Sequence, residues 1–409
     1  MTASAEIPTV DRRNRVGNPA RLAFVTSTPL SVAGGSGTYV GIRELGRFLA
    51  ERGVRVSTYA PRWWSPSYTL KRLLFNLEVA RRLRSGRHDW VVGFDLDGFH
   101  YGRAPTAPYI ASIKGVIADE LRNERGTVRV MLAVQAAFER LAVHRARVVV
   151  ATSRYSRARI VEAYGISPAK VVLVPEPIDL RAWEGGQGEA GCAEADPPAI
   201  LTVAHLYPRK NVGVLLHAYA RLRGAGVRFQ GWIVGEGPCR RAWERLRDEL
   251  GLQGCVEFLG TVSRRALEAR YRQAAVFCLP SRQEGFGIVF LEAMANARPI
   301  VAARAAAVPE TVTEGEVGLL ADPDNPDEFA RGLATLLGDR DLRRHMGAAG
   351  RRRVESYRAD RVAELFLVTV QAALDRHTGA EIDRGERGGG VGTDRAAGER
   401  TDGETGVME

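Results

Sequence analysis

Short apolar segments alternate with helical segments along most of the chain. Apolar, β-compatible stretches lie at residues 21–27, 54–60, 90–95, 109–115 and 148–153 in the first half, and at 199–205, 229–235, 255–260, 276–280 and 299–303 in the second. Between them apolar residues recur at helical spacing, as at Ile42, Leu45 and Leu49. Two successive arrays of this kind predict an α/β protein with two doubly wound parallel sheets and a ligand cleft at the carboxyl ends of the strands.

The same pattern divides the chain into two predicted domains. They span residues 20–183 and 198–355, and a chain of 409 residues is long enough for two cores. The connector at 184–197 is rich in glycine, alanine and glutamate, which is typical of a flexible linker. Residues 1–19 and 378–409 contain few apolar side chains, so we expect both ends to be disordered.

The distribution of basic residues bears on nucleic-acid and membrane partners. The net charge is +10, but the arginines are scattered through the helices, so we expect no nucleic-acid partner. Only residues 62–87 combine clustered basic residues with aromatics, including Trp63 and Trp64. This segment is either an ordinary amphipathic helix with a solvated basic face or an element that meets an acceptor or a membrane surface.

Targeting and redox signals are weak. No apolar run approaches the roughly 18 residues that a membrane span requires, and the first twenty residues lack a signal-peptide core, so we expect a cytoplasmic protein. The four cysteines show no C-x-x-C spacing. They predict reduced thiols, without a zinc site or a disulfide framework.

The most informative segment is SRQEGFGIVFLEAMANARPIV, residues 281–301. It places Glu284 and Glu292 eight positions apart around a predicted strand-to-helix turn that contains Gly285 and Gly287. Glu292 would lie about 7.5 Å along the helix, a reach suited to ribose hydroxyls, and Glu284 would meet a sugar on the other side of a diphosphate. The alternative is a pair of unrelated surface glutamates.

The turn itself is a candidate anion site. If the helix begins near Gly287, the backbone amides of Gly287, Ile288 and Val289 have no partner within the helix and face the preceding loop, where the helix dipole favours a diphosphate. A second glycine loop, with Gly34, Gly35 and Gly37, precedes the first predicted helix. Its amides can approach a phosphate or an acceptor, unless the loop is merely a flexible turn.

These segments together resemble the family 4 retaining glycosyltransferases, which have the GT-B fold. The resemblance rests on the E-x7-E segment and on LTVAHLYPRKN (201–211), WIVGEGP (232–238), VEFLGTV (256–262) and VGLLADPDNPDEFARGL (317–333), and it extends more loosely over residues 20–376. It implies two Rossmann-like domains that face a central cleft, with residues 356–377 crossing back to the first domain as a helix. It also implies a nucleoside diphosphate sugar as donor, without a metal or other cofactor.

The resemblance also suggests roles for individual residues. Lys210 stands where the family has a lysine that contacts the donor diphosphate. His205 stands where the family has an arginine, and the neighbouring Arg209 can take over the role of that arginine. Lys114 stands in place of a histidine, where it can hold a hydroxyl, a phosphate or a carboxylate. The expected catalytic residues are Glu284, Lys210 and Lys114, and the expected donor-binding residues are Gly34, Gly35, Gly37, His205, Arg209, Lys210, Gly235, Gly237, Val262, Glu284, Phe286, Gly287, Ile288, Val289 and Glu292.

Two further features lie in the first domain. Asp95 and Asp97 end the third predicted strand on the cleft side, and without a histidine-rich partner they predict acceptor contact or turn capping more than a metal pair. Trp63 and Trp64 are further acceptor-side candidates. At the domain junction the sequence P-E-P stiffens the chain and adds Glu176.

The resulting hypothesis is a metal-independent glycosyltransferase. It would move a sugar from a UDP- or GDP-sugar, with retention, to a small polar metabolite of natural-product biosynthesis. Membrane association is possible but not favoured at this stage. The alternatives are a transferase acting on a lipid-linked or cell-envelope glycan at a membrane, a GT-B sugar-nucleotide epimerase, and a catalytically silent binding subunit.

Overall fold

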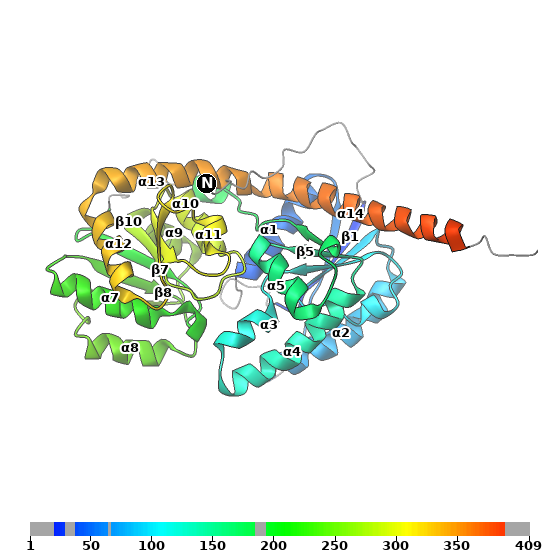
Figure 1. Cartoon of the computed structure of the whole chain (residues 1–409), viewed down its shortest axis with the longest axis horizontal. Coiled ribbons are helices and arrows are strands. Elements are labelled where there is room, and N and C mark those ends of the chain that lie inside the picture. The colour runs from blue at the N-terminus through cyan, green and yellow to red at the C-terminus, as the bar shows by residue number, and fades with distance from the viewer. Residues whose placement is uncertain (1–19, 29–36, 64–66, 185–193, 389–409) are drawn as a thin grey trace, which may run out of the picture.

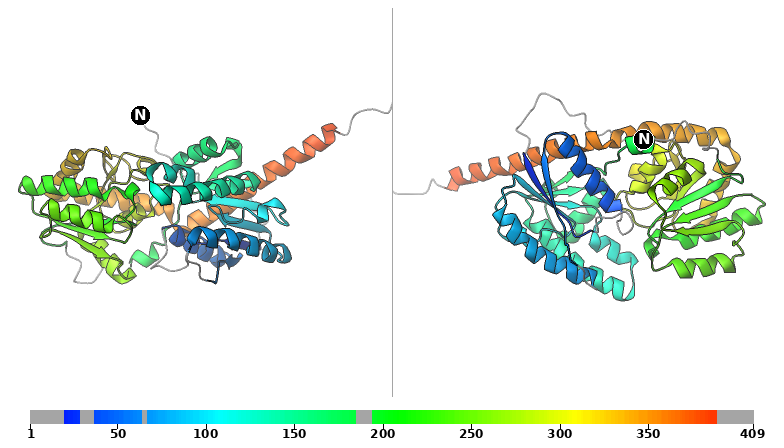
Figure 2. Two further views of the ribbon diagram at one scale, coloured as in Figure 1. Left: turned by 90° about the horizontal axis from the view of Figure 1, so that it is seen from below. Right: turned by 180° about the vertical axis from the view of Figure 1, so that it is seen from behind.

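The computed structural model describes residues 20–28, 37–63, 67–184 and 194–388, with side chains described as far as Arg376 (Figure 1). Within these ranges the chain forms two α/β domains side by side, joined along one edge by a long helix (Figures 1 and 2).

The first domain is built on a parallel six-stranded sheet in the order β2-β1-β3-β4-β5-β6. Its strands are β1 (Arg21–Val25), β2 (Arg55–Tyr59), β3 (Trp90–Phe94), β4 (Tyr109–Ile113), β5 (Val148–Ala151) and β6 (Val171–Leu173). Its helices are α1 (Gly37–Glu51), α2 (Tyr68–Ser85), α3 (Ile117–Glu120), α4 (Gly126–Arg145), α5 (Arg154–Tyr164) and α6 (Arg181–Glu184). Strands β3, β4 and β5 are buried at every residue, because helices cover both faces of the sheet.

The second domain repeats this architecture with the order β12-β11-β10-β7-β8-β9, again parallel throughout. Its strands are β7 (Ala199–Val203), β8 (Gln230–Val234), β9 (Val256–Gly260), β10 (Ala274–Leu279), β11 (Ile300–Ala303) and β12 (Gly318–Ala321). Its helices are α7 (Val212–Gly224), α8 (Arg240–Glu249), α9 (Arg264–Gln273), α10 (Ile288–Ala295), α11 (Val308–Thr311), α12 (Pro326–Gly338) and α13 (Arg340–Arg353).

The predicted architecture of two parallel α/β sheets is confirmed. Each of the ten strand-like segments corresponds to a strand, whereas the pattern missed β6 and β12. Both are outermost strands of three or four residues. Segments this short carry too little periodicity to distinguish a strand from a loop.

Helix α14 (Ala359–Gly388) ties the domains together. The chain leaves the first domain beside the point where it returns, since the Ile178 amide donates to Tyr357 O and the Ala359 amide donates to Ile178 O, both at 2.9 Å. Helix α14 then packs its apolar side chains, Phe366 among them, against the first sheet and α1. Figure 1 shows α14 lying along the first domain and extending beyond it, while α13 lies over the second domain.

The carboxyl-terminal segment differs in part from the expectation. Helix α14 runs past Thr378 to Gly388, although a disordered tail was predicted from residue 378. The stretch combines alanine, glutamate and arginine, which favour helix, with Gly379, Gly385 and Gly388, which do not, so its composition does not decide between helix and coil. Residues 1–19, 389–409 and most of the linker, 185–193, lie outside the described residues.

We expect the contact of α14 with the first domain to be needed for that domain's stability. Phe366 is 1% exposed, and its ring lies 6.5 Å from that of Trp90 between ring centroids. Phe366→Ala should lower the free energy of unfolding by about 3–5 kcal/mol, because it leaves a cavity in the core. Urea denaturation followed by circular dichroism measures the change. Val368→Ala, at a position 40% exposed on the same helix, serves as the control, and an equally small effect of both substitutions would contradict this role.

Candidate active site

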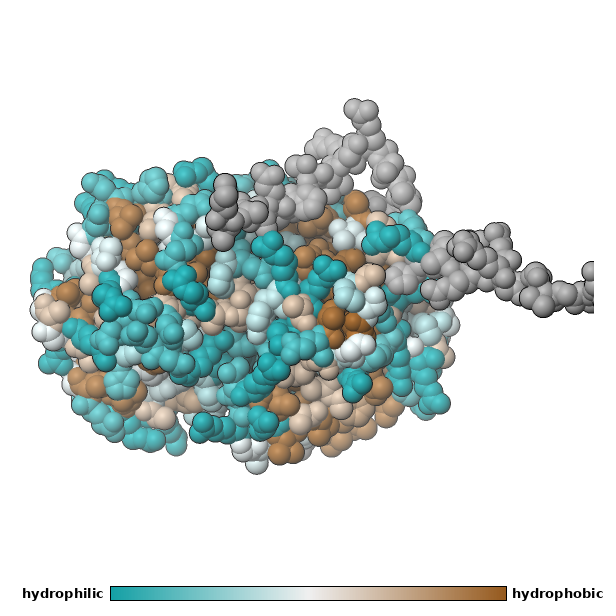
Figure 3. Space-filling view, viewed as in Figure 1, coloured by the Kyte–Doolittle hydropathy of each residue, from teal (hydrophilic) through white to brown (hydrophobic). Residues whose placement is uncertain are grey.

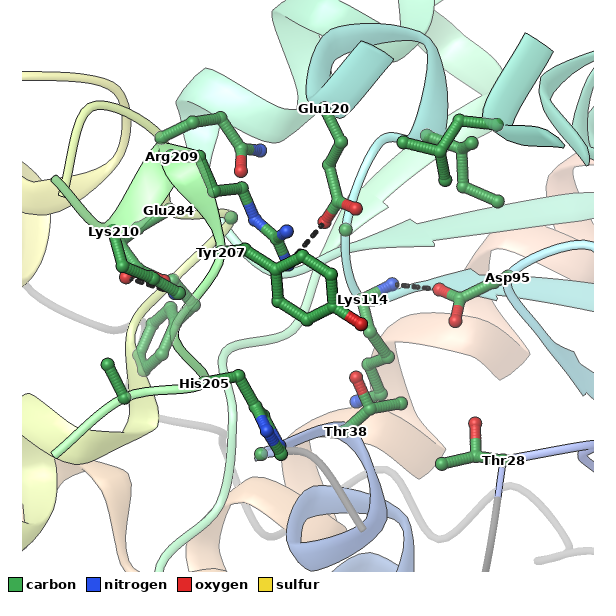
Figure 4. A pocket seen from close by; sticks show the side chains of 18 of the residues that line it. Thr28, Thr38, Asp95, Lys114, Glu120, His205, Tyr207, Arg209, Lys210 and Glu284 are labelled. Atoms are coloured by element: carbon green, nitrogen blue, oxygen red, sulfur yellow. Dashed lines mark hydrogen bonds and ion pairs between the residues drawn. The ribbon is translucent and has the colours of Figure 1, made fainter. Parts of the chain in front are cut away.

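A cavity of about 650 Å³ lies between the two domains. Residues that follow the carboxyl ends of β3, β4, β7 and β10 contribute to its walls, namely Asp95, Lys114, His205 and Glu284. Figure 4 shows these side chains converging from both domains. The cleft at the strand ends that the sequence predicts is therefore present.

The domains meet at Gly285, immediately after Glu284. The Gly285 carbonyl oxygen lies 2.8 Å from Ser153 Oγ and 3.0 Å from Ser156 Oγ, both at the start of α5. A Cβ atom on Gly285 would lie only 2.6 Å from the carbonyl oxygen of Lys114. Glycine is therefore required here by the close approach of the two backbones, in addition to any effect on the turn.

Lys210 and Glu284 form an ion pair at the cavity wall. Residues 208–210 form one 3-10 turn after β7, begun by Pro208, and this turn directs Lys210 into the cavity. Its Nζ atom lies 2.6 Å from Glu284 Oε1 (Figure 4). The pair places a cation beside the first glutamate of the E-x7-E segment.

Arg209 spans the cavity to the first domain. Its guanidinium lies 3.5 Å from Glu124 Oε1 and 3.8 Å from Glu120 Oε1 (Figure 4). Burial opposes the charge of Arg209, but Glu120, Glu284 and Glu124 outweigh this effect and raise its pKa. Burial raises the pKa of Glu124, and Arg209 acts in the opposite direction. The contact holds a second cation close to Lys210.

Helix α10 begins at the cavity with Ile288, next to Gly287, near which the sequence predicts its start. Gly287 caps it with φ +87°, and a side chain there would collide with the Phe290 ring. Ile288 and Val289, the first residues of the helix, line the cavity together with Phe286. The amino-terminal end of an eight-residue helix is thus presented to the same space as Lys210.

Glu292 occupies a different environment from Glu284. It does not line the cavity, and its Oε2 atom accepts a hydrogen bond of 2.9 Å from the Tyr271 hydroxyl. Burial raises its pKa. Both glutamates of the E-x7-E segment are therefore buried, but Glu284 lines the cavity and Glu292 does not.

Lys114 and Asp95 form the first-domain side of the cavity. The Lys114 amide donates to Asp95 Oδ1 at 2.9 Å (Figure 4). Lys114 Nζ lies 3.0 Å from Glu176 Oε1. Burial raises the pKa of Asp95 to about 6, although nearby Arg72 opposes the shift.

Asp97 does not line the cavity, so the structure gives it neither the expected acceptor contact nor a role in capping its own turn, because its carboxylate bonds to distant segments. It is fully buried, and its carboxylate accepts hydrogen bonds from the backbone and hydroxyl of Ser27, from Asn76 and from Arg72. The positive φ of 56° at Asp95 changes the chain direction after β3 and turns Asp97 inward. Sequence periodicity does not reveal such a turn.

The other expected residues fall into three groups. Gly37, His205, Arg209, Phe286, Gly287, Ile288 and Val289 line the cavity, as do Lys114, Lys210 and Glu284. Gly235, Gly237 and Val262 do not; the first two pack against the backbone of residues 204–206, which forms part of the wall. Trp63 donates to Glu78 and is also absent from the lining, while Trp64, Gly34 and Gly35 lie outside the described residues.

Sequence reasoning missed several cavity residues. Glu120, Glu124, Tyr207 and Arg72 line the cavity without having been predicted. Glu120 ends α3, and Glu124 follows the 3-10 turn at residues 121–123. Their spacing in the sequence contains no signal that both meet Arg209 of the other domain.

Three observations bear on metals, thiols and membranes. Among the described residues, no cluster of three or more His, Cys, Asp and Glu side chains is arranged to hold a metal ion. Cys239, Cys255 and Cys278 are free thiols, and Cys192 lies outside the described part of the chain. None of the helices within the described ranges is both long and apolar enough to span a bilayer.

Similar solved structures share the fold. Sucrose-phosphate synthase from Thermosynechococcus elongatus superposes with a TM-score of 0.71 at 20% identity, over 88% of this chain and 99% of that one. HepE from Anabaena, in complex with UDP-glucose, superposes with a TM-score of 0.67 at 16% identity, over 86% of this chain and 99% of that one.

Curated relatives are more similar in sequence. The GDP-mannose-dependent alpha-(1-6)-phosphatidylinositol monomannoside mannosyltransferase of Mycobacterium tuberculosis is 29% identical over 81% of this chain and 93% of the relative. Its namesake from Mycolicibacterium smegmatis is 34% identical over 50% of this chain, a match that spans 57% of the relative. A D-inositol 3-phosphate glycosyltransferase of Corynebacterium efficiens is 32% identical over 64% of this chain and 63% of its own length.

Family models match both domains. The model described as "Glycosyltransferase Family 4" matches residues 33–182, and the model described as "Glycosyl transferases group 1" matches residues 191–353. Together with the two facing sheets, these matches confirm the resemblance seen in the sequence: the chain belongs to the group 1, family 4 glycosyltransferases of the GT-B fold.

Proposed function

We propose that this enzyme transfers a glycosyl group from a nucleoside diphosphate sugar to an acceptor hydroxyl with retention at the anomeric carbon. The observation that carries the proposal is the convergence of Lys210, Arg209 and the amino-terminal end of α10 beside Glu284 in one cavity. Two cations and a helix dipole suit a diphosphate, and an adjacent carboxylate suits sugar hydroxyls.

The same groups account for catalysis without a metal. Negative charge grows on the diphosphate as the bond to the sugar breaks, and fixed cations and amides stabilise this charge. In the mechanism that we propose, the acceptor attacks from the face that the diphosphate leaves, and a phosphate oxygen takes the acceptor's proton. Lys210, now paired with Glu284, would share its charge with the bound diphosphate.

The acceptor has two candidates. One is a small polar metabolite, as in natural-product assembly. The relatives' names refer to phosphatidylinositol monomannoside and to D-inositol 3-phosphate, which have an inositol ring in common. We therefore propose a polyhydroxylated ring as the group that enters the cavity, whether it is free or attached to a lipid.

A specific surface favours the lipid-attached form. On α2, Leu70, Leu74 and Leu77 follow helical spacing and are each nearly half exposed. On α4, Val130, Val134 and Leu141 also follow helical spacing and are 65%, 41% and 38% exposed. Figure 3 shows hydrophobic residues gathered at the lower right, where Figure 1 places these two helices.

This apolar surface is continuous with the cavity. Tyr68 of α2 and Met131 of α4 are both about 40% exposed, and both also line the cavity. Gln135 of α4 bonds to Thr69 and Arg72 of α2, which holds the two helices together at this point. An acceptor with its polar ring in the cavity would therefore have an apolar route outward for a lipid chain.

The activity itself can be tested by a donor screen. We expect the purified chain to turn over a UDP- or GDP-hexose with inositol, inositol phosphate or phosphatidylinositol as acceptor, in excess EDTA, because Lys210 and the α10 amides replace a metal. Mass spectrometry identifies the product, and NMR determines its anomeric configuration. Loss of activity in EDTA with rescue by magnesium would contradict the metal-free mechanism. An epimerised sugar formed without acceptor would identify an epimerase, and absence of any turnover would indicate a silent binding subunit.

The two glutamates should have separable effects. Glu284→Gln should lower kcat by about 100-fold with little change in nucleoside diphosphate affinity, because contact with the sugar strengthens as charge develops. Glu292→Ala should weaken nucleoside diphosphate binding by about 10-fold if ribose hydroxyls take over the hydrogen bond from Tyr271. Calorimetry and initial rates measure both effects. Tyr271→Phe is the control, and identical losses for Tyr271→Phe and Glu292→Ala would show that Glu292 only supports the fold.

The apolar surface predicts binding to membranes. We expect the protein to co-sediment with vesicles of phosphatidylcholine and phosphatidylinositol. Leu74→Asp combined with Val134→Asp should abolish this binding, because each charge would enter the apolar boundary. Val368→Asp, a similarly exposed apolar position on α14, is the matched control. If the wild type remains in the supernatant while it glycosylates free inositol phosphate, the acceptor is a small polar metabolite.

A further inference from the structure

The cavity contains a buried ion pair that the proposed chemistry does not use. Lys114 Nζ lies 3.0 Å from Glu176 Oε1 and 3.1 Å from Glu176 Oε2. Both side chains are less than 10% exposed, and both line the cavity. They come from distant segments, one after β4 and the other after β6.

The chain around Glu176 holds its carboxylate in place. Pro175 and Pro177 flank it, so the backbone on both sides has little freedom. Ile178 then bonds to the residues on either side of Arg358 at the crossing between domains. On α1, a Cβ atom at Gly41 would lie 2.1 Å from Glu176 Oε2, so the absence of a side chain at this position makes room for the carboxylate.

The pair lies close to the proposed sugar position. The Lys114 carbonyl oxygen packs against Gly285, the neighbour of Glu284. Figure 4 shows the Lys114 side chain extending along the cavity toward Thr38, at the start of α1. A sugar that contacts Glu284 therefore has Lys114 and Glu176 on the adjoining wall.

We propose that Glu176 is a specificity-determining residue that makes the enzyme select an uncharged hexose over a hexuronate. This inference rests on the proposed function, because it takes the transferred sugar to lie in this cavity. An ammonium without a partner would attract the carboxylate of a hexuronate. With Glu176 in contact, the charge is balanced, and a second carboxylate meets repulsion from the first.

The paired groups can still bind neutral hydroxyls. An ammonium has three N–H donors, and the hydrogen bond to Glu176 Oε2 uses one of them, which leaves donor capacity for a sugar oxygen. The carboxylate keeps lone pairs that accept from a neighbouring hydroxyl. The pair therefore offers one donor and one acceptor side by side, which matches two adjacent hydroxyls of a hexose.

The experiment compares binding and turnover of paired ligands. The probes are UDP-glucose with UDP-glucuronate and GDP-mannose with GDP-mannuronate, measured by calorimetry and by initial rates. The wild type should favour the hexose. Glu176→Gln should shift the hexose-to-hexuronate ratio of Kd by at least about 10-fold toward the hexuronate, because Lys114 is then uncompensated.

Two further variants separate specificity from folding and from net charge. Gly41→Ala should shift the ratio in the same direction, because its methyl group displaces the carboxylate without removing it. Glu51→Gln makes the same charge change at an exposed position on α1 that pairs with Arg47 and Arg181, and it should leave the ratio unchanged. If Glu176→Gln does not fold, Gly41→Ala still carries the test.

The outcomes distinguish this inference from the proposed function. An unchanged ratio in both cavity variants, or equal weakening for hexose and hexuronate, would overturn the specificity role and leave the transferase intact. If the hexose-to-hexuronate ratio of Kd shifts as expected but no turnover is seen, the role of Glu176 is supported and the proposed activity is overturned. A wild type that binds none of the four nucleotide sugars would overturn both.

Discussion

The close approach of the two domains at Gly285 is the contact on which the site depends. A glycine carbonyl meets the hydroxyls of Ser153 and Ser156, and the same residue packs against the backbone of Lys114. Because only a residue without a side chain permits this distance, Glu284 is brought next to groups of the first domain. Each sheet alone would present half of the cavity.

Burial of charge is the second constraint. Taking ionised groups out of water is costly unless they are paired. The cavity accordingly pairs each of its prominent cations with a carboxylate: Lys210 with Glu284, Lys114 with Glu176, and Arg209 with Glu120 and Glu124. Two of these pairings join residues of different segments within one domain, and the third crosses between domains. In the proposed reaction, the donor diphosphate would compete with Glu284 for Lys210, and with Glu120 and Glu124 for Arg209.

An exposed apolar surface of the first domain adjoins the cavity. The cavity opens beside Tyr68 and Met131, and the exposed leucines and valines of α2 and α4 continue from there. The basic and aromatic composition of residues 62–87 drew attention to this region. Composition alone left two alternatives open, an ordinary amphipathic helix and an element that meets an acceptor or a membrane surface, because it does not show whether the apolar residues face the core or the solvent.

The sequence by itself determined the two parallel sheets, ten of their strands, the turn before α10 and most of the residues around it. These features arise from local periodicity and from glycine and glutamate at short spacing, and local chain geometry converts such patterns directly into structure. It did not determine which polar side chains face the cavity. The chain reversal at Asp95 turns Asp97 into the core, and Glu292 bonds to Tyr271 outside the cavity lining. Glu176, after β6, meets Lys114, after β4, across the one intervening strand, β5. Only the tertiary structure decided these pairings, because a buried polar group takes the partner that packing places beside it, and packing joins residues far apart in the chain.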